Sequence, residues 1–298
     1  MKGSALLATF LAITLATPAL GATTKVPTPQ LTVKPLAATI STQLSAGDEV
    51  AQMMSTSNGI VLLGTLETTT SPLITAVPLG GSDGFIVALD TKGNHLWDLR
   101  LGTSGDDVAT AGLIDNTGNI WVAGASAASM TTPAPGLNQL MLWEISPTGT
   151  LLNTFKRTLS DIDVPTSITQ KGVNLLITGA SNKPGLATFS LTATLFGKIG
   201  APKNSNIAPA AATQFFTSMS AAYIWQNYVT TQGIKGVSGI PLHQATTVLI
   251  ESTIKGGVLK AVFSLVGSPL ALRYQLGIGV IALTQGSGSY YLTIIHTK

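Results

Sequence analysis

Acidic side chains gather at the turns that precede three apolar segments of this chain. These turns lie near residues 48–50, 106–108 and 161–164. Carboxylates from neighbouring turns can hold a cation, a basic ligand or a sugar, and a pair of them can serve as general acid and general base. The candidate binding residues are therefore Asp48, Glu49, Asp106, Asp107, Asp161 and Asp163, with His243 added from a later loop.

A second interpretation of the acidic turns is structural, and we favour it. Asp in a turn commonly accepts hydrogen bonds from nearby backbone N–H groups and needs no ligand. The Asp, Asn and Gly clusters supply too few ligands for a dedicated calcium loop. We therefore expect no cofactor and no metal site, with calcium at the acidic turns as the open alternative.

Catalytic signatures are absent from the sequence. The three histidines, His95, His243 and His296, have no spacing that makes a zinc site or an acid–base pair. There is no G-x-S-x-G motif, phosphate loop or dinucleotide fingerprint. We interpret His243 as a solvated loop residue, because one histidine without partners makes no mechanism. The catalytic residues, if there are any, stay unknown.

A repeated unit of short strands must position these residues. Gly64, Gly124 and Gly179 occupy matching places in it. Each unit is expected to hold four strands, the second ending in a small residue directly after one of these glycines, as at 60–65, 119–125 and 173–180. The turns 90–94, 115–119 and 146–150 carry Gly where a short hairpin loop needs a positive φ. The third unit is expected to place its outer strand at 195–200.

Units of about 40–60 residues made only of short strands predict an all-β protein with radially arranged blades. A weaker fourth unit covers residues 208–266, and the last unit supplies three strands, at 270–276, 279–284 and 289–296. Residues 38–47 have the pattern of a missing outer strand. We therefore predict a β-propeller of five four-stranded blades, closed by this N-terminal strand, with six blades as the alternative.

The best copy of the repeat, within residues 80–126, resembles a known family. It contains DGFIVALDTKGNHLW, then GTSGDD, then DNTGNIWVAGAS. In this order the three pieces resemble the bacterial SBBP-type β-propeller repeats. The resemblance implies a propeller within a secreted or surface protein. It implies no catalytic residues, because the family has none in common.

Composition predicts how the chain is divided into segments and in which cellular compartment the protein lies. Residues 1–21 read as a cleavable signal peptide, 22–37 as an extended Thr- and Pro-rich spacer, and 38–298 as a single propeller domain. No later apolar run reaches the length of a membrane span. The chain has no cysteine, so its stability must come from packed sheets. We expect a secreted or envelope-associated, extracytoplasmic protein.

Charge is unevenly distributed along the chain. All acidic residues except Glu251 lie at or before Asp163, and basic residues are scattered singly after Lys171. Nucleic-acid binding is not expected, since the basic residues are not clustered with aromatic ones. A weak affinity for an anionic envelope polymer is compatible with this pattern.

Alternation of strand direction puts the loops from second to third strands and the connections between blades on one face. We name it the long-loop face, because the loops 67–81, 127–138 and 230–244 are long. The first hypothesis is a non-enzymatic module that binds a surface polymer, glycan or protein there. The alternative is a propeller hydrolase or lyase whose acids are Asp106, Asp107, Asp161 and Asp163. A purely structural envelope component is a third possibility.

Overall fold

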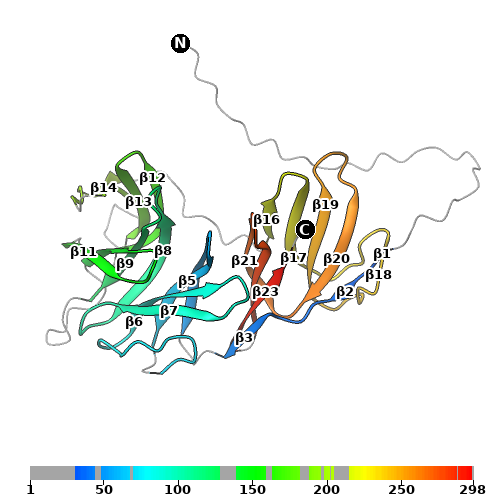
Figure 1. Ribbon diagram of the computed structural model, residues 1–298, viewed down its shortest axis with the longest axis horizontal. Helices are drawn as coiled ribbons and strands as arrows, with labels where there is room; N and C mark the ends of the chain where they lie inside the picture. The colour runs from blue at the N-terminus through cyan, green and yellow to red at the C-terminus, as the bar shows by residue number, and fades with distance from the viewer. Residues whose placement is uncertain are drawn as a thin grey trace, which may run out of the picture.

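The computed structural model describes residues 31–43, 48–67, 70–127, 139–158, 163–181, 188–195, 198–201, 203–204, 215–286 and 288–296, and these residues form strands and turns (Figure 1). Their main architecture is a set of five antiparallel sheets in chain order. In the part of the chain that is described, no helix has the length and apolar character to cross a membrane.

The first two sheets follow the predicted repeat closely. Each pairs its strands in sequence order, so that neighbours along the chain are neighbours in the sheet. The first contains β4 (Glu49–Thr56), β5 (Gly59–Leu66), β6 (Asp83–Asp90) and β7 (His95–Leu101), and the second contains β8 (Asp107–Ile114), β9 (Ile120–Ser126), β10 (Gln139–Ile145) and β11 (Leu151–Thr158).

The third sheet departs from the predicted pattern at its outer edge. It contains β12 (Asp163–Lys171), β13 (Asn174–Ser181), β14 (Thr188–Thr194) and the short β15 (Lys203–Asn204). Of the expected outer strand at 195–200, the described residues form a single bridge, between Ala193 and Ile199. Gly200 follows that bridge, and glycine weakens a strand because it has no side chain to pack.

The fourth and fifth sheets confirm that the degenerate end of the chain keeps the same plan. The fourth contains β16 (Phe215–Met219), β17 (Tyr223–Thr230), β19 (Thr246–Thr253) and β20 (Leu259–Leu265), and the fifth contains β21 (Ser268–Gln275), β22 (Gly279–Gly286) and β23 (Ser289–Ile295).

The N-terminal segment runs along the edges of these last two sheets. β3 (Ile40–Gln43) pairs antiparallel with β23 and completes the fifth sheet, as the sequence predicts. Pairing begins earlier than the expected start near Ala38. β1 (Leu31–Thr32) pairs with β18 (Val237–Ser238) in the loop between β17 and β19, and β2 (Lys34–Pro35) adds a fifth strand to β20. Part of the predicted spacer is therefore paired with the sheets.

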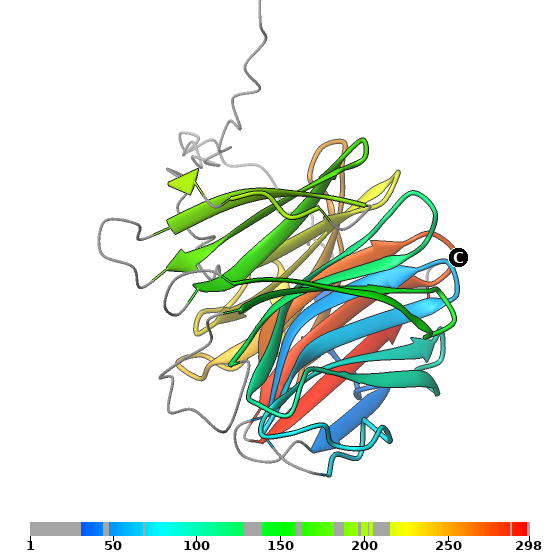
Figure 2. The ribbon, with the colours of Figure 1, turned by 90° about the vertical axis from the view of Figure 1, so that its left-hand side faces the viewer.

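Neighbouring sheets contact one another through their first strands. Gln52 on β4 exchanges two hydrogen bonds with the backbone of Gly112 on β8, at 3.0 and 2.6 Å. Thr110 on β8 donates to the Pro165 carbonyl on β12, and the Tyr274 N–H on β21 donates to Ser218 Oγ on β16. Figure 2 shows the sheets from the side on which the second and third sheets (green) lie in Figure 1.

The hydrophobic core is divided into layers between the sheets. Separate clusters join the fourth sheet to the fifth, the fifth to the first, the first to the second and the second to the third. Among the described residues, no such cluster joins the third sheet to the fourth. In Figure 1 the second and third sheets lie on the left, and the fourth and fifth lie on the right. A closed ring is therefore not seen.

One steric requirement explains why glycine stands at all three matched positions. At each, a Cβ atom would collide with a carbonyl oxygen of the sheet's first strand and with an aromatic ring of its third strand. Only glycine permits this close approach. The sets are Gly64 with the Glu49 carbonyl and Phe85, Gly124 with Val108 and Trp143, and Gly179 with Val164 and Phe189.

Candidate functional site

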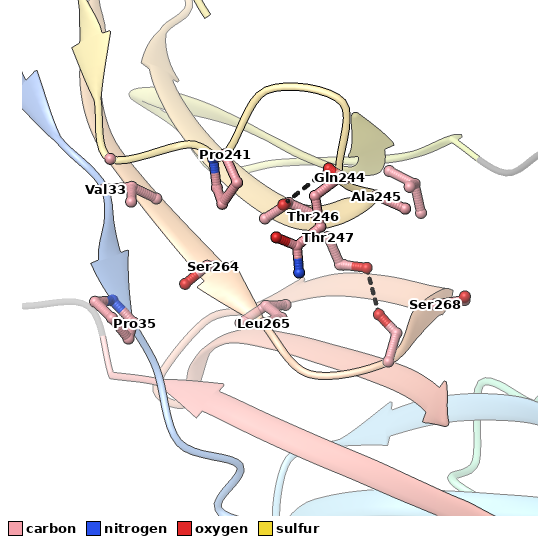
Figure 3. Close-up of a pocket in the computed structure, with 13 residues that line it drawn as sticks. Val33, Pro35, Pro241, Gln244, Ala245, Thr246, Thr247, Ser264, Leu265 and Ser268 are labelled. Atoms are coloured by element: carbon pink, nitrogen blue, oxygen red, sulfur yellow. Dashed lines mark hydrogen bonds between the residues drawn. The ribbon is translucent and has the colours of Figure 1, made fainter. Parts of the chain in front are cut away.

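A pocket of about 510 Å³ opens on the long-loop face of the fourth sheet (Figure 3). We call it the long-loop pocket. Four segments line it: the N-terminal segment with β1 and β2 (residues 31–35), the loop between β17 and β19 with the adjoining strand ends, the end of β20 and the turn into β21. Its lining residues are Val33, Pro35, Val229, Gly239, Pro241, Gln244, Ala245, Thr246, Thr247, Ser264, Leu265, Gly267 and Ser268.

The lining of the long-loop pocket is neutral. It combines apolar groups with hydroxyls and one amide, and none of its side chains carries a charge. Thr247 donates a hydrogen bond to the Gly267 carbonyl, and Thr246 donates to the Gln244 carbonyl at 3.3 Å. Leu242 and Val266, which follow the lining residues Pro241 and Leu265 in the chain, are 67% and 52% exposed. Such a surface suits an uncharged partner with polar and apolar parts.

Asp48 and Glu49 stand at the start of β4. Asp48 is buried, and its Oδ1 accepts a hydrogen bond of 2.8 Å from the N–H of Glu67. Glu49 is exposed. Tyr290 Oη lies close by, 3.2 Å from the backbone nitrogen of Val50. Burial raises the pKa of Tyr290, and the charges of Glu49 and Asp48 act in the same direction.

Asp106 and Asp107 hold the connection between β7 and β8. Asp106 Oδ1 accepts from the N–H of Ser82 at 3.0 Å, and Asp107 Oδ2 accepts from the N–H and hydroxyl of Thr103 at 2.7 and 3.0 Å. Burial raises the pKa of Asp107, and the charge of Asp83 contributes to the rise. Asp48, Asp106 and Asp107 thus each accept a hydrogen bond from a backbone N–H group of the surrounding loops.

An ion pair that the sequence did not reveal lies beside Asp107. Asp83 Oδ2 is 2.8 Å from Arg100 Nη1, and both side chains are buried, at 0% and 1% exposure. Asp83 Oδ2 also accepts from the N–H of Leu79, while Arg100 Nε donates to the Ala76 carbonyl. Within the described part of the chain, Asp83 Oδ1 and Asp107 Oδ1 are buried without a hydrogen-bond partner.

Asp98 completes the attachment of the loop between β5 and β6. Its carboxylate accepts from the N–H groups of Thr75 and Ala76 at 3.0 and 2.7 Å, and it contacts His95 Nε2 at 2.7 Å. Burial opposes ionisation of Asp98, but the hydrogen bonds outweigh it and lower the pKa. Together with Asp83 and Asp106, Asp98 fixes residues 75–82 against the first sheet.

Of the remaining predicted site residues, only His243 has a described side chain. Asp161 lies outside the described residues, and for Asp163 the structure describes only the backbone, at the first position of β12. His243 is exposed, and its backbone has a φ of 62°. The long-loop pocket itself was missed, because a neutral lining drawn from four segments leaves no motif in the sequence.

In the described ranges, no group of three or more His, Asp or Glu side chains is placed to hold a metal ion. Of the other two histidines, His95 contacts Asp98, and His296 Nδ1 lies 3.0 Å from the Ile278 carbonyl oxygen. The chemistry available at the long-loop pocket is therefore hydrogen bonding and apolar contact.

Four-stranded antiparallel sheets that contact a neighbouring sheet through their first strands are typical of the blades of β-propellers. No protein-family model and no curated protein matches the sequence. Similar solved structures include a glucose dehydrogenase, at 11% identity, a TM-score of 0.41, and coverage of 87% of this chain and 100% of the other. The WD40 domain of Pan2 from Neurospora crassa has 12% identity, a TM-score of 0.30, and coverage of 85% and 81%.

An exo-beta-1,3-galactanase from Phanerochaete chrysosporium is also similar, at 11% identity and a TM-score of 0.35. The match covers 88% of this chain and 64% of that protein. At such identities and scores, neither an activity nor a ligand passes from these proteins to this chain.

Proposed function

We propose that this chain is a secreted, non-enzymatic binding module, built as a closed five-bladed β-propeller related to the SBBP-type repeats. It binds an uncharged part of a surface glycan, polymer or protein on its long-loop face. Five described sheets and the pairing of β3 with β23 support the five-bladed plan. Closing the ring of blades requires the third sheet to pack against the fourth.

The observation that carries this proposal is the neutral lining of the long-loop pocket. A hydrolase or lyase needs a positioned acid, base or nucleophile in its pocket. The side chains that line this one are apolar, hydroxyl or amide groups. They donate and accept hydrogen bonds and exclude water, which is what a recognition site requires.

Rigid loops on the same face support a binding role. Asp83, Asp98 and Asp106 hold residues 75–82 through backbone hydrogen bonds. A loop fixed before binding loses little conformational entropy when a partner arrives. Val77 and Leu79 in this loop are 78% and 46% exposed, so their apolar side chains are accessible to a partner.

Secretion and calcium dependence rest on the sequence alone. The signal peptide proposed at residues 1–21 places the module outside the cytoplasm. Calcium remains a candidate ligand of the acidic turns. The test is thermal melting with and without calcium, for the natural chain and for Asp107→Asn with Asp161→Asn. A calcium-dependent rise in melting temperature that the double substitution removes supports the site, and an unchanged melting temperature removes it.

The binding proposal is tested by capture of purified envelope polysaccharides and envelope proteins on the immobilised protein. Gln244→Ala removes an amide from the pocket, and Ala245→Trp fills it. We expect Gln244→Ala to weaken capture about two- to tenfold, the value of one hydrogen bond, and Ala245→Trp to abolish it. Gln232→Ala is the matched control, since Gln232 is exposed in the same loop and does not line the pocket.

Three outcomes contradict the proposal. If neither Gln244→Ala nor Ala245→Trp changes capture, the binding site is not the long-loop pocket. No capture of any polymer or protein refutes the binding module. Shortening of a captured polymer, measured as new chain ends, replaces the binding module with the hydrolase or lyase.

A further inference from the structure

A second pocket, of about 670 Å³, lies on the opposite face, where the short turns between first and second strands and between third and fourth strands meet. We call this the turn face, and we call the cavity the Trp97 pocket. It receives side chains from the first, second and fifth sheets. Those that matter for its chemistry are Trp97, Leu96, Pro147, Asn58, Thr148 and Gln275.

Trp97 differs from the other tryptophans of the chain. Trp121, Trp143 and Trp225 are at most 2% exposed and belong to the core between or within the sheets. Trp97 is only partly buried and lines the pocket. Its neighbour Leu96 is 51% exposed at the same opening. An aromatic ring at a pocket wall offers a flat apolar surface to a ligand.

The position of the Trp97 ring is fixed by the neighbouring sheet. Its Nε1 donates a hydrogen bond of 3.3 Å to the Pro147 carbonyl. Gly149, with a φ of 84°, packs so close to the ring that a Cβ atom there would lie 2.5 Å from it. The indole is therefore held between two sheets in the free protein. A ring fixed in this way loses little freedom when a ligand stacks on it.

The polar groups of the Trp97 pocket are all neutral. They are hydroxyls of Ser and Thr together with the amides of Asn58 and Gln275. Ser55 Oγ donates to Gln275 Oε1 at 2.9 Å, which fixes the amide at the wall. No lining side chain carries a charge. An ionic ligand would lose its hydration there without gaining an ion pair.

These features together define the ligand class. A neutral sugar presents a face of C–H groups, which stacks on an aromatic ring, and a rim of hydroxyls, which pair with hydroxyl and amide side chains. We propose that the Trp97 pocket binds a neutral oligosaccharide, with Trp97 as the stacking platform and Asn58 among its hydrogen-bonding partners. This site is separate from the long-loop pocket and does not depend on it.

The test titrates the full protein with cellohexaose, laminarihexaose, maltohexaose and chitohexaose. Tryptophan fluorescence and calorimetry report binding. Because the other tryptophans are buried, a change in emission reports on Trp97. We expect at least one of these sugars to bind with an affinity that salt does not change, since no charge takes part. Trp97→Ala should weaken binding about tenfold or more, and Trp97→Phe by less.

A second pair of variants separates binding from folding. Asn58→Ala alters an exposed turn residue and should weaken binding about two- to tenfold. Asn116→Ala is its control, because Asn116 is also exposed in a turn between first and second strands but does not line the pocket. Gln244→Ala lies in the long-loop pocket and should leave sugar binding unchanged. This holds even if the protein captures no envelope polymer, because the two sites are separate.

Several results overturn the proposal. One is the absence of binding by all four sugars. Another is sugar binding that Trp97→Ala and Asn58→Ala leave intact. A third is capture of a neutral proline-rich peptide at Trp97 while every sugar fails, which would make the pocket a peptide site.

Discussion

The buried ion pair between Asp83 and Arg100 leads to a quantitative prediction. The two side chains are at most 1% exposed and 2.8 Å apart. Replacing Arg100 with Met keeps an apolar stem but leaves the carboxylate of Asp83 buried without its counter-charge. Breaking a buried pair in this way costs about 3–5 kcal/mol of stability. We expect Arg100→Met to lower the free energy of unfolding by this amount.

The assay is urea unfolding at neutral pH, followed by tryptophan fluorescence. An unchanged slope against urea shows that the unfolded state is comparable. Lys92→Met is the matched control, because Lys92 is exposed on the same sheet, and it should change stability by less than about 0.5 kcal/mol. Asp83→Leu with Arg100→Met should cost less than Arg100→Met alone, since no buried charge remains.

The reasoning behind this prediction is refuted if Arg100→Met costs less than about 1 kcal/mol, which is the value of an exposed pair. It is also refuted if the double substitution is as damaging as the sum of the single ones. Either result would mean that Asp83 finds water or another cation when Arg100 is removed.

Three further predictions concern single residues. Because the pKa of Asp107 is raised in the folded state, its ionisation lowers stability as pH rises from the ordinary aspartate pKa to that raised pKa. We therefore expect melting temperature to fall between acidic and neutral pH, and Asp107→Asn should flatten that fall. Asp115 behaves oppositely. Burial opposes its ionisation, but hydrogen bonds from Thr117, Trp121 and Asn119 outweigh burial and lower its pKa. The ionised carboxylate therefore stabilises the folded state at neutral pH, and this contribution is lost as pH falls. Asp115→Asn should lower the free energy of unfolding by about 1–3 kcal/mol at pH 7 and by less in acid. His243→Gly should raise the free energy of unfolding, measured by thermal melting, by up to about 1 kcal/mol, because a positive φ strains histidine. A lower stability would show instead that the histidine ring makes a contact that the fold needs.

The strand plan was predictable because it rests on local chemistry. Gly64, Gly124 and Gly179 mark where each second strand pairs closely with the first strand of the same sheet, and the structure explains them by this close approach. The pairing of residues 40–43 with β23 was also predictable, since an outer strand was missing from the last unit. Both inferences needed only the repeat.

Contacts between different strands and loops were not predictable. Asp83 and Arg100 look like ordinary strand ends in the sequence, and their pairing depends on how the loop at 75–82 folds back. The pairing of residues 31–35 was missed because a Thr- and Pro-rich segment has the composition of a spacer. The two pockets draw on several sheets each, and a single sequence carries no record of that proximity.

The pairing of β3 with β23 has a consequence for the order in which the protein is made. Thr39 Oγ1 accepts a hydrogen bond from the N–H of Ile294, and 255 residues separate the two. The strand that is synthesised early must therefore wait, unpaired, until nearly the whole chain has been produced. Contacts this distant in sequence form late. A chain truncated before β23 would leave both β3 and the edge of β22 unpaired, and such open edges favour aggregation.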